Sequence, residues 1–168
     1  MNANWNYPTA MRVGPGRLSE LPDVCQEAGI SAPLLVTDPG LATLPMVENS
    51  IISCRDAGLR CELFSNIKPN PTGQNVEDGV QVYLEGQHDG VIAFGGGSGI
   101  DAAKSVVLMA HQNVSIWELE DVGDNWTRAD GELIAPIVAL PTTAGTGAEV
   151  GRAAVILSDR RESRDLGR

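Results

Sequence analysis

Positive charge is scarce in this sequence of 168 residues. Lysine and arginine number 12 against 22 aspartates and glutamates, which gives a formal net charge of −10. Nucleic acids and anionic membrane surfaces both require a basic face on the protein that binds them. The composition therefore argues against nucleic acid and membrane partners and leaves a small ligand open.

Long apolar runs are absent as well. No stretch approaches the roughly 20 consecutive apolar residues that a bilayer span needs. The first residues, MNANW, lack both the basic flank and the apolar centre of a secretory signal. We therefore expect a cytoplasmic protein.

Potential metal ligands are few. Cys25, Cys54 and Cys61 are odd in number and follow no metal or redox spacing, so we expect buried, reduced thiols. His88 and His111 share no ligand spacing with each other or with a carboxylate cluster, and we expect both at the surface or at a helix end. The sequence predicts no metal site.

What the sequence does contain is an alternation of short apolar runs with segments of helical periodicity. We expect helices at 18–28, 46–57, 74–85 and 98–110, and strands at 11–13, 33–37, 60–64, 89–94, 133–140 and 153–157. Such alternation predicts an α/β fold, with a parallel sheet covered by helices on both faces.

Three consecutive glycines, Gly95, Gly96 and Gly97, join a predicted strand to a predicted helix. A helix amino terminus offers unpaired N–H groups and a positive dipole end, and glycines allow a phosphate to approach them closely. The loop thus predicts a phosphate site, although a tight turn without a ligand is the alternative. Ser98 and Asp101 have the spacing of a capping box, which requires no ligand.

Two more polar segments follow predicted strands. Asp38 stands where nucleotide-binding folds place a carboxylate that binds the adenosine ribose and repels a 2′-phosphate, which favours NAD over NADP. An ordinary Asp-Pro-Gly turn is the alternative there. The run PTTAGTG at 141–147 offers hydroxyl groups for phosphate or nicotinamide ribose, unless it is a mobile surface loop.

Four ordered motifs together resemble the iron-containing (group III) alcohol dehydrogenase family. They are VTDPGL at 36–41, KPNPT at 68–72, GGGSGIDAAK at 95–104 and PTTAGTGAEV at 141–150. The resemblance extends from about residue 7 to 157 and corresponds to the amino-terminal half of family members. It implies a Rossmann-like, dehydroquinate-synthase-like domain that binds a nicotinamide dinucleotide, in enzymes that interconvert alcohols and aldehydes by hydride transfer.

The resemblance also implies residue roles. Asp38 would meet the adenosine ribose, and the glycine loop with Ser98 would meet the pyrophosphate. The threonines of PTTAGTG would meet the adenine and phosphate side. The cofactor positions implied in this way are Asp38, Asn70, Gly95, Gly96, Gly97, Ser98, Asp101, Lys104, Thr142, Thr143 and Thr146.

Departures from the family pattern set further expectations. Ala148 stands where members usually carry serine. Members also continue into a helical domain whose aspartate and three histidines hold iron or another divalent metal such as zinc. We therefore expect a dinucleotide-binding domain over 1–158, a charged tail over 159–168, and no metal-binding domain. Such a chain would hold no metal and would have weak or no dehydrogenase activity alone.

Two alternative functions stay open, and the sequence also sets an expectation for the oligomeric state. Glycerol dehydrogenase and dehydroquinate synthase relatives share similar glycine loops but fit PTTAGTG less well, and a non-catalytic nucleotide-binding or interaction module is also compatible. In relatives, the segment corresponding to 5–13 pairs across a dimer. Because an isolated domain would expose apolar surface near 141–157, we expect a homodimer or higher homo-oligomer.

Overall fold

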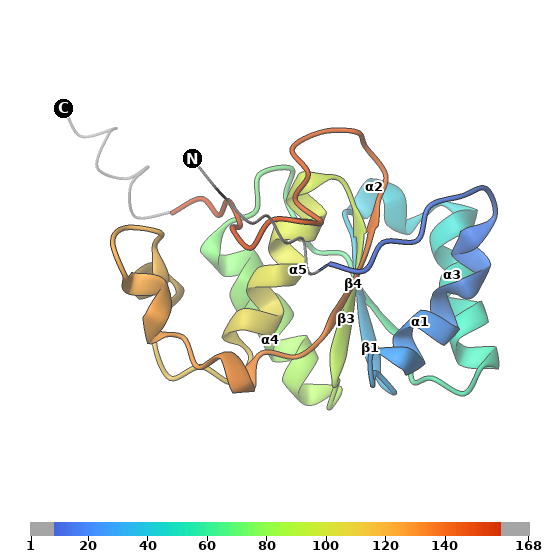
Figure 1. The fold of residues 1–168 in the computed structure, drawn as a ribbon, viewed down its shortest axis with the longest axis horizontal. Coiled ribbons are helices and arrows are strands. Elements are labelled where there is room, and N and C mark those ends of the chain that lie inside the picture. The colour runs from blue at the N-terminus through green and yellow to red at the C-terminus, as the bar shows by residue number, and fades with distance from the viewer. Residues whose placement is uncertain (1–8, 159–168) are drawn as a thin grey trace, which may run out of the picture.

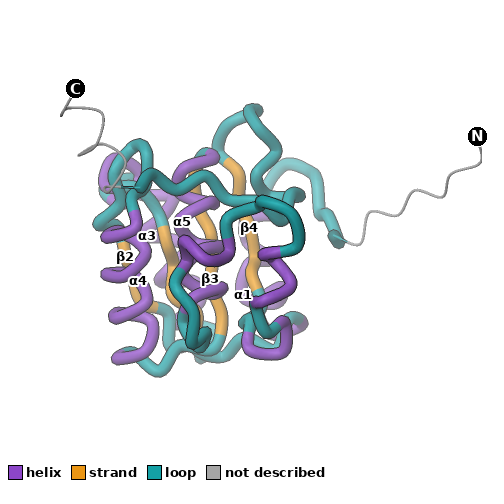
Figure 2. Tube along the Cα trace, turned by 90° about the vertical axis from the view of Figure 1, so that its left-hand side faces the viewer, coloured by secondary structure: helices purple, strands orange, loops and turns teal. Residues whose placement is uncertain are grey.

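A computed structural model describes residues 9–158, and in it four parallel strands form one sheet in the order β2-β1-β3-β4. Figure 2 shows β4 at one edge of this sheet. The expected parallel sheet is confirmed. The strands are β1 (Pro33–Val36), β2 (Glu62–Phe64), β3 (Gly90–Gly95) and β4 (Ile137–Pro141).

Helices cover both faces of the sheet, as the alternation of elements predicts. In Figure 1, α1 (Leu21–Glu27) and α3 (Pro45–Asp56) lie on one side of the sheet. The other side is covered by α4 (Gly73–Glu85) and α5 (Gly97–Met109). A short helix that we did not expect, α2 (Pro39–Ala42), follows β1 at the end of the sheet.

The central strands bury side chains on both faces, because successive residues of a strand point in opposite directions. Leu34 and Val91 belong to the core between the sheet and the α4–α5 pair. Leu35 and Ile92, one position further on, belong to the core between the sheet and the α1–α3 pair. The fully buried β1 and β3 are therefore continuous apolar runs. Because both faces of these strands are packed, the ends of the strands are held firmly in place.

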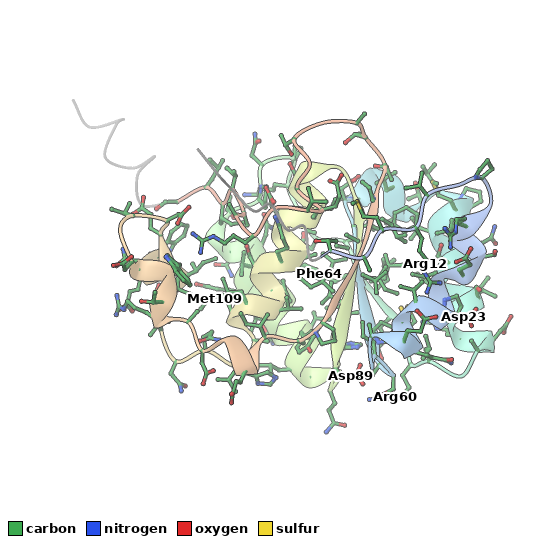
Figure 3. The ribbon with its side chains drawn as sticks, in the orientation of Figure 1. Arg12, Asp23, Arg60, Phe64, Asp89 and Met109 are labelled. Atoms are coloured by element: carbon green, nitrogen blue, oxygen red, sulfur yellow. The ribbon has the colours of Figure 1, made fainter. Side chains whose placement is uncertain are left out.

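Gly79 allows α4 and α5 to pack closely against each other. A Cβ atom added there would lie 2.5 Å from Cγ2 of Val106 on α5 and 3.0 Å from the ring of Phe64. Figure 3 labels Phe64, a residue of β2 whose side chain belongs to the same core as the buried residues of α5. This contact fixes the position of α5 and hence the position of its amino terminus.

The amino end of the sheet is closed by Asp89, which Figure 3 labels. Its carboxylate accepts hydrogen bonds from the backbone N–H groups of Ser31 and Ala32. Burial of this carboxyl group opposes its ionisation, but the hydrogen bond from the Ser31 hydroxyl, together with those from the two N–H groups, more than offsets that effect and holds the pKa of Asp89 below its usual value. Charge on Asp89 thus helps to join the start of β3 to the start of β1.

The cysteines and one histidine lie in the interior. Cys25, Cys54 and Cys61 are buried free thiols, as expected. His88 was expected at the surface, and that expectation is wrong: its side chain is 1% exposed, and Nδ1 lies 2.9 Å from the carbonyl oxygen of Ala32. His111 is exposed at the end of α5, in agreement with the sequence.

Three expected strands differ from the structure. Residues 11–13 form an exposed irregular segment in which Arg12 pairs with Glu20 and Glu27 on the adjacent helical segments. The segment 153–157 is irregular too, apart from an isolated parallel bridge between Leu157 and Thr72. The expected strand 133–140 begins only at Ile137, because Leu133 ends a 3-10 turn and residues 134–136 are irregular. The 3-10 turns before β4 span Ile116–Leu119, Asn125–Arg128 and Gly131–Leu133, and a further one, Arg17–Glu20, precedes α1.

Candidate functional site

Polar segments from three strands meet at the carboxyl edge of the sheet. Asp38 follows β1, and Gly96 follows β3. Residues 142–147, which we call the threonine loop, follow β4. Because β3 lies between β1 and β4, its glycine loop has the other two segments as neighbours. This edge is where open α/β sheets bind ligands.

The glycine loop presents an uncapped helix amino terminus. Gly96 precedes α5 with extended backbone, and no side chain caps the helix. The capping box expected from Ser98 and Asp101 is therefore wrong. Ser98 instead donates its hydroxyl hydrogen to the carbonyl oxygen of Pro69, and Asp101 points to a different segment. The first N–H groups of α5 thus lack a side-chain acceptor within residues 9–158.

The threonine loop lies against the glycine loop. The backbone N–H of Thr142 donates to the carbonyl oxygen of Gly95 at 3.0 Å. A Cβ atom at Gly96 would lie 3.3 Å from Oγ1 of Thr143, and one at Gly97 would lie 3.2 Å from Oγ1 of Thr146. The missing side chains therefore leave a cradle bordered by backbone amides and hydroxyl groups, which are donors that suit a phosphate.

Asp38 uses its two carboxylate oxygens differently. Oδ1 accepts hydrogen bonds from the N–H groups of Gly40 at 2.9 Å and Leu41 at 3.0 Å, so Asp38 forms a local turn that caps the start of α2. Oδ2 lies 3.9 Å from the position a Cβ would take at Gly95. One oxygen builds the turn, and the other faces the glycine loop.

Two further residues border this edge. Asn70 is exposed in the connector that Ser98 ties to the glycine loop through Pro69. Thr37, which the sequence did not single out, is fully buried, and its hydroxyl has no hydrogen-bond partner among the described residues. A buried hydroxyl without a partner is energetically costly. The hydroxyl of Thr37 is therefore available to form a hydrogen bond with a molecule bound at this edge.

Asp101 and Lys104 point away from the glycine cradle. Their charged atoms are 3.0 Å apart, and Oδ2 of Asp101 accepts a hydrogen bond from the N–H of Val155. Lys104 donates to the carbonyl oxygens of Ala148 at 3.0 Å and Gly151 at 3.2 Å, and also to that of Ala153. The pair contacts the chain that follows the threonine loop.

The loops open onto a groove of about 2830 Å³ that runs along β4. Its lining includes Phe94, Leu140, Thr142 and Thr143, so apolar side chains lie beside the hydroxyl groups. Among residues 9–158, no three histidine, cysteine or carboxylate side chains gather closely enough to hold a metal ion. Across the same span, no helix has both the length and the apolar character needed to cross a bilayer.

Comparison with known proteins connects this geometry to a family. The family model described as iron-containing alcohol dehydrogenase matches residues 8–167. The chain belongs to the iron-containing alcohol dehydrogenase family. The resemblance inferred from the four motifs is thereby confirmed for the amino-terminal part of the family.

Individual relatives of the family agree with this. A choline dehydrogenase from Bacillus subtilis (strain 168) is 35% identical, over 94% of this chain and 39% of its own length. A 4-hydroxybutyrate dehydrogenase from Cupriavidus necator is also 35% identical, over 96% of this chain and 41% of its own length. The chain therefore spans about two fifths of these relatives.

Solved structures of family members have the same fold. An archaeal halo-thermophilic alcohol dehydrogenase from a Red Sea brine pool superimposes with a TM-score of 0.83 at 31% identity, over 94% of this chain and 41% of its own. A sulfoacetaldehyde reductase from Bifidobacterium kashiwanohense, solved in complex with NAD⁺, gives a TM-score of 0.82 at 28% identity, over 100% of this chain and 42% of its own.

Proposed function

We propose that this chain forms the dinucleotide-binding part of an oxidoreductase that interconverts alcohols and aldehydes, with NAD as its preferred cofactor. The observation that carries the proposal is the cradle between the glycine and threonine loops, at the amino terminus of α5. Family membership and the NAD⁺ bound to a structural relative support it.

In this proposal the pyrophosphate lies on the backbone of Gly95, Gly96 and Gly97 and beside Ser98. Amides at the start of α5 and the dipole of this helix of 13 residues stabilise its negative charge. The hydroxyls of the threonine loop border the same cradle on the adenine and phosphate side. They belong to Thr142, Thr143 and Thr146.

Two residues hold the rest of the dinucleotide in the proposed arrangement. Asp38 accepts hydrogen bonds from the adenosine ribose through Oδ2, the oxygen that the turn leaves available. Asn70 flanks the cofactor from the connector that Ser98 holds in place. The protein thus contributes orientation of the dinucleotide against rigid strand ends.

Bound NAD would supply the hydride acceptor for alcohol oxidation. We further propose that the divalent metal of the family, iron or zinc, is held by residues other than 9–158, and that this chain alone has weak or no dehydrogenase activity. The alternative function is a nucleotide-binding module without catalysis, and the same cradle supports it. Turnover of primary alcohols by this chain with NAD and added iron or zinc would exclude the module without catalysis.

Cofactor choice gives a direct test at Asp38. We expect calorimetry to show tighter binding of NAD than of NADP, because a carboxylate facing the ribose repels a 2′-phosphate. Asp38→Asn retains the oxygen that caps α2 but removes the charge. NADP affinity should then rise about tenfold, which corresponds to about 1.4 kcal/mol.

The matched control for this variant is Asp23→Asn, because Asp23 is exposed on α1, away from the cradle. Its cofactor preference should equal that of the unmodified chain. Equal or tighter binding of NADP by the unmodified protein would contradict the proposed contact between Asp38 and the adenosine ribose.

We also propose that the chain assembles into a homodimer or higher homo-oligomer. β4 is an edge strand, and apolar side chains near the groove are exposed, including Val155 at 72% and Trp126 at 49%. Apolar surface of this kind and unpaired strand edges favour association. We expect light scattering at micromolar concentration to give at least twice the mass of one chain. A monomeric mass that is insensitive to dilution and salt would contradict this assembly.

A further inference from the structure

The segment 148–155, which returns from the threonine loop across α5, has little regular structure of its own. We call it the return segment. Its backbone makes two turn hydrogen bonds, from the N–H groups of Val150 and Gly151 to the carbonyl oxygen of Gly147 at the end of the threonine loop. Beyond its end, Leu157 donates to Pro71 at 2.8 Å. Among the described residues, these backbone bonds alone would leave most of the segment unsupported.

Asp101 and Lys104 supply the missing support from α5. They lie one helical turn apart, and their side chains are 12% and 13% exposed. The ammonium group of Lys104 donates to three carbonyl oxygens of the return segment, while Asp101 accepts from the N–H of Val155. A lysine ammonium has three N–H donors, and those carbonyls together with the Asp101 carboxylate surround it with acceptors.

The first of these carbonyls belongs to Ala148, directly after the threonine loop. The other end of the loop is tied by the hydrogen bond from Thr142 to Gly95. The loop is therefore fixed at both ends, by β3 in front and by Lys104 behind. Between the two ties, the hydroxyls of Thr143 and Thr146 lie against the glycine cradle.

We infer that Asp101 and Lys104 are positioning residues, which hold the threonine loop over the glycine cradle through the return segment instead of contacting the cofactor themselves. This inference rests on the proposed function for its effect on NAD. Its structural half does not, because the pair would order the loop before any ligand binds. Partial release of the loop would reduce affinity in proportion to the fraction of molecules with the loop in place.

Lys104→Met tests the inference through two readouts. In the protein without ligand, we expect hydrogen exchange of amides in 142–157 to accelerate at least about tenfold, while exchange in β1 and β3 stays unchanged. NAD affinity should fall about tenfold if the loop is in place in one molecule out of ten. Because the unpaired carboxylate of Asp101 could destabilise the fold, the double variant Asp101→Asn, Lys104→Met provides a neutral pair at the same positions and should give the same two results.

Arg152→Met is the matched control. Arg152 belongs to the return segment, but its ion pair with Asp121 is exposed, at 63% and 65%, and the Trp126 ring on which it stacks is 49% exposed, so its replacement should change neither readout. Lost NAD binding with unchanged exchange in the Lys104 variants would overturn the inference and indicate direct contact with the cofactor. Accelerated exchange in a protein that binds no NAD even when unmodified would support the positioning role and reject the proposed function instead.

Discussion

Replacing Gly97 with valine is expected to abolish NAD binding while leaving the chain folded. The added Cβ would lie 3.2 Å from Oγ1 of Thr146, inside the cradle where we place the pyrophosphate. The backbone of Gly97 belongs to the first turn of α5 and is not left-handed, so valine can adopt it. We expect calorimetry to show at least about a hundredfold loss of affinity, equivalent to about 2.7 kcal/mol.

Gly131→Val is the control, since a Cβ at Gly131 meets nothing within 4 Å. Its affinity for NAD should match that of the unmodified chain. Circular dichroism of both variants reports whether they fold. A Gly97→Val protein that unfolds would favour the tight-turn interpretation of the three glycines, and one that binds NAD normally would place the cofactor elsewhere.

The largest effect on stability is expected at Gly79, where α4 approaches α5. Valine at this position would drive its side chain into Val106 and Phe64, since even a Cβ would lie 2.5 Å and 3.0 Å from them. Overpacking of a core of this kind costs about 3 kcal/mol of the free energy of unfolding. Urea denaturation followed by circular dichroism measures it.

A second substitution shows whether this contact is the cause. Val106→Ala removes the methyl group that the new side chain would meet, so the double variant Gly79→Val, Val106→Ala should be more stable than the sum of the two single changes predicts. If Gly79→Val instead unfolds at the same urea concentration as the unmodified chain, α4 and α5 do not pack as described.

The sequence predicts the layered architecture because the signals for it are local. The apolar run at 89–94 and the helical spacing after it identify β3 and α5 almost to the residue. For Asp38 the sequence left two roles open, a local turn and a contact with ribose. Each role needs only one carboxylate oxygen, and in the structure Oδ1 accepts the hydrogen bonds of the turn.

Contacts between distant segments are what the sequence could not supply. The spacing of Ser98 and Asp101 fits a capping box, but Asp101 finds its partner 54 residues later, at Val155. Ser98 likewise reaches back to Pro69. His88 looks like a surface residue by position, yet the carbonyl of Ala32 supplies a buried partner for it. Each of these depends on how strands are ordered in the sheet, which no local pattern contains.

Titration of the ¹⁵N-labelled chain with NAD⁺, followed by NMR of its backbone amides, tests the central claim most directly. We expect the amide resonances of Gly96, Gly97 and Ser98 and those of the threonine loop to shift in a saturable manner. Amides at the opposite end of the sheet, such as those of Ser31 and Asp89, should stay in place. Saturable shifts confined to that opposite end, or no shifts at millimolar NAD⁺ in a folded protein, would contradict the account.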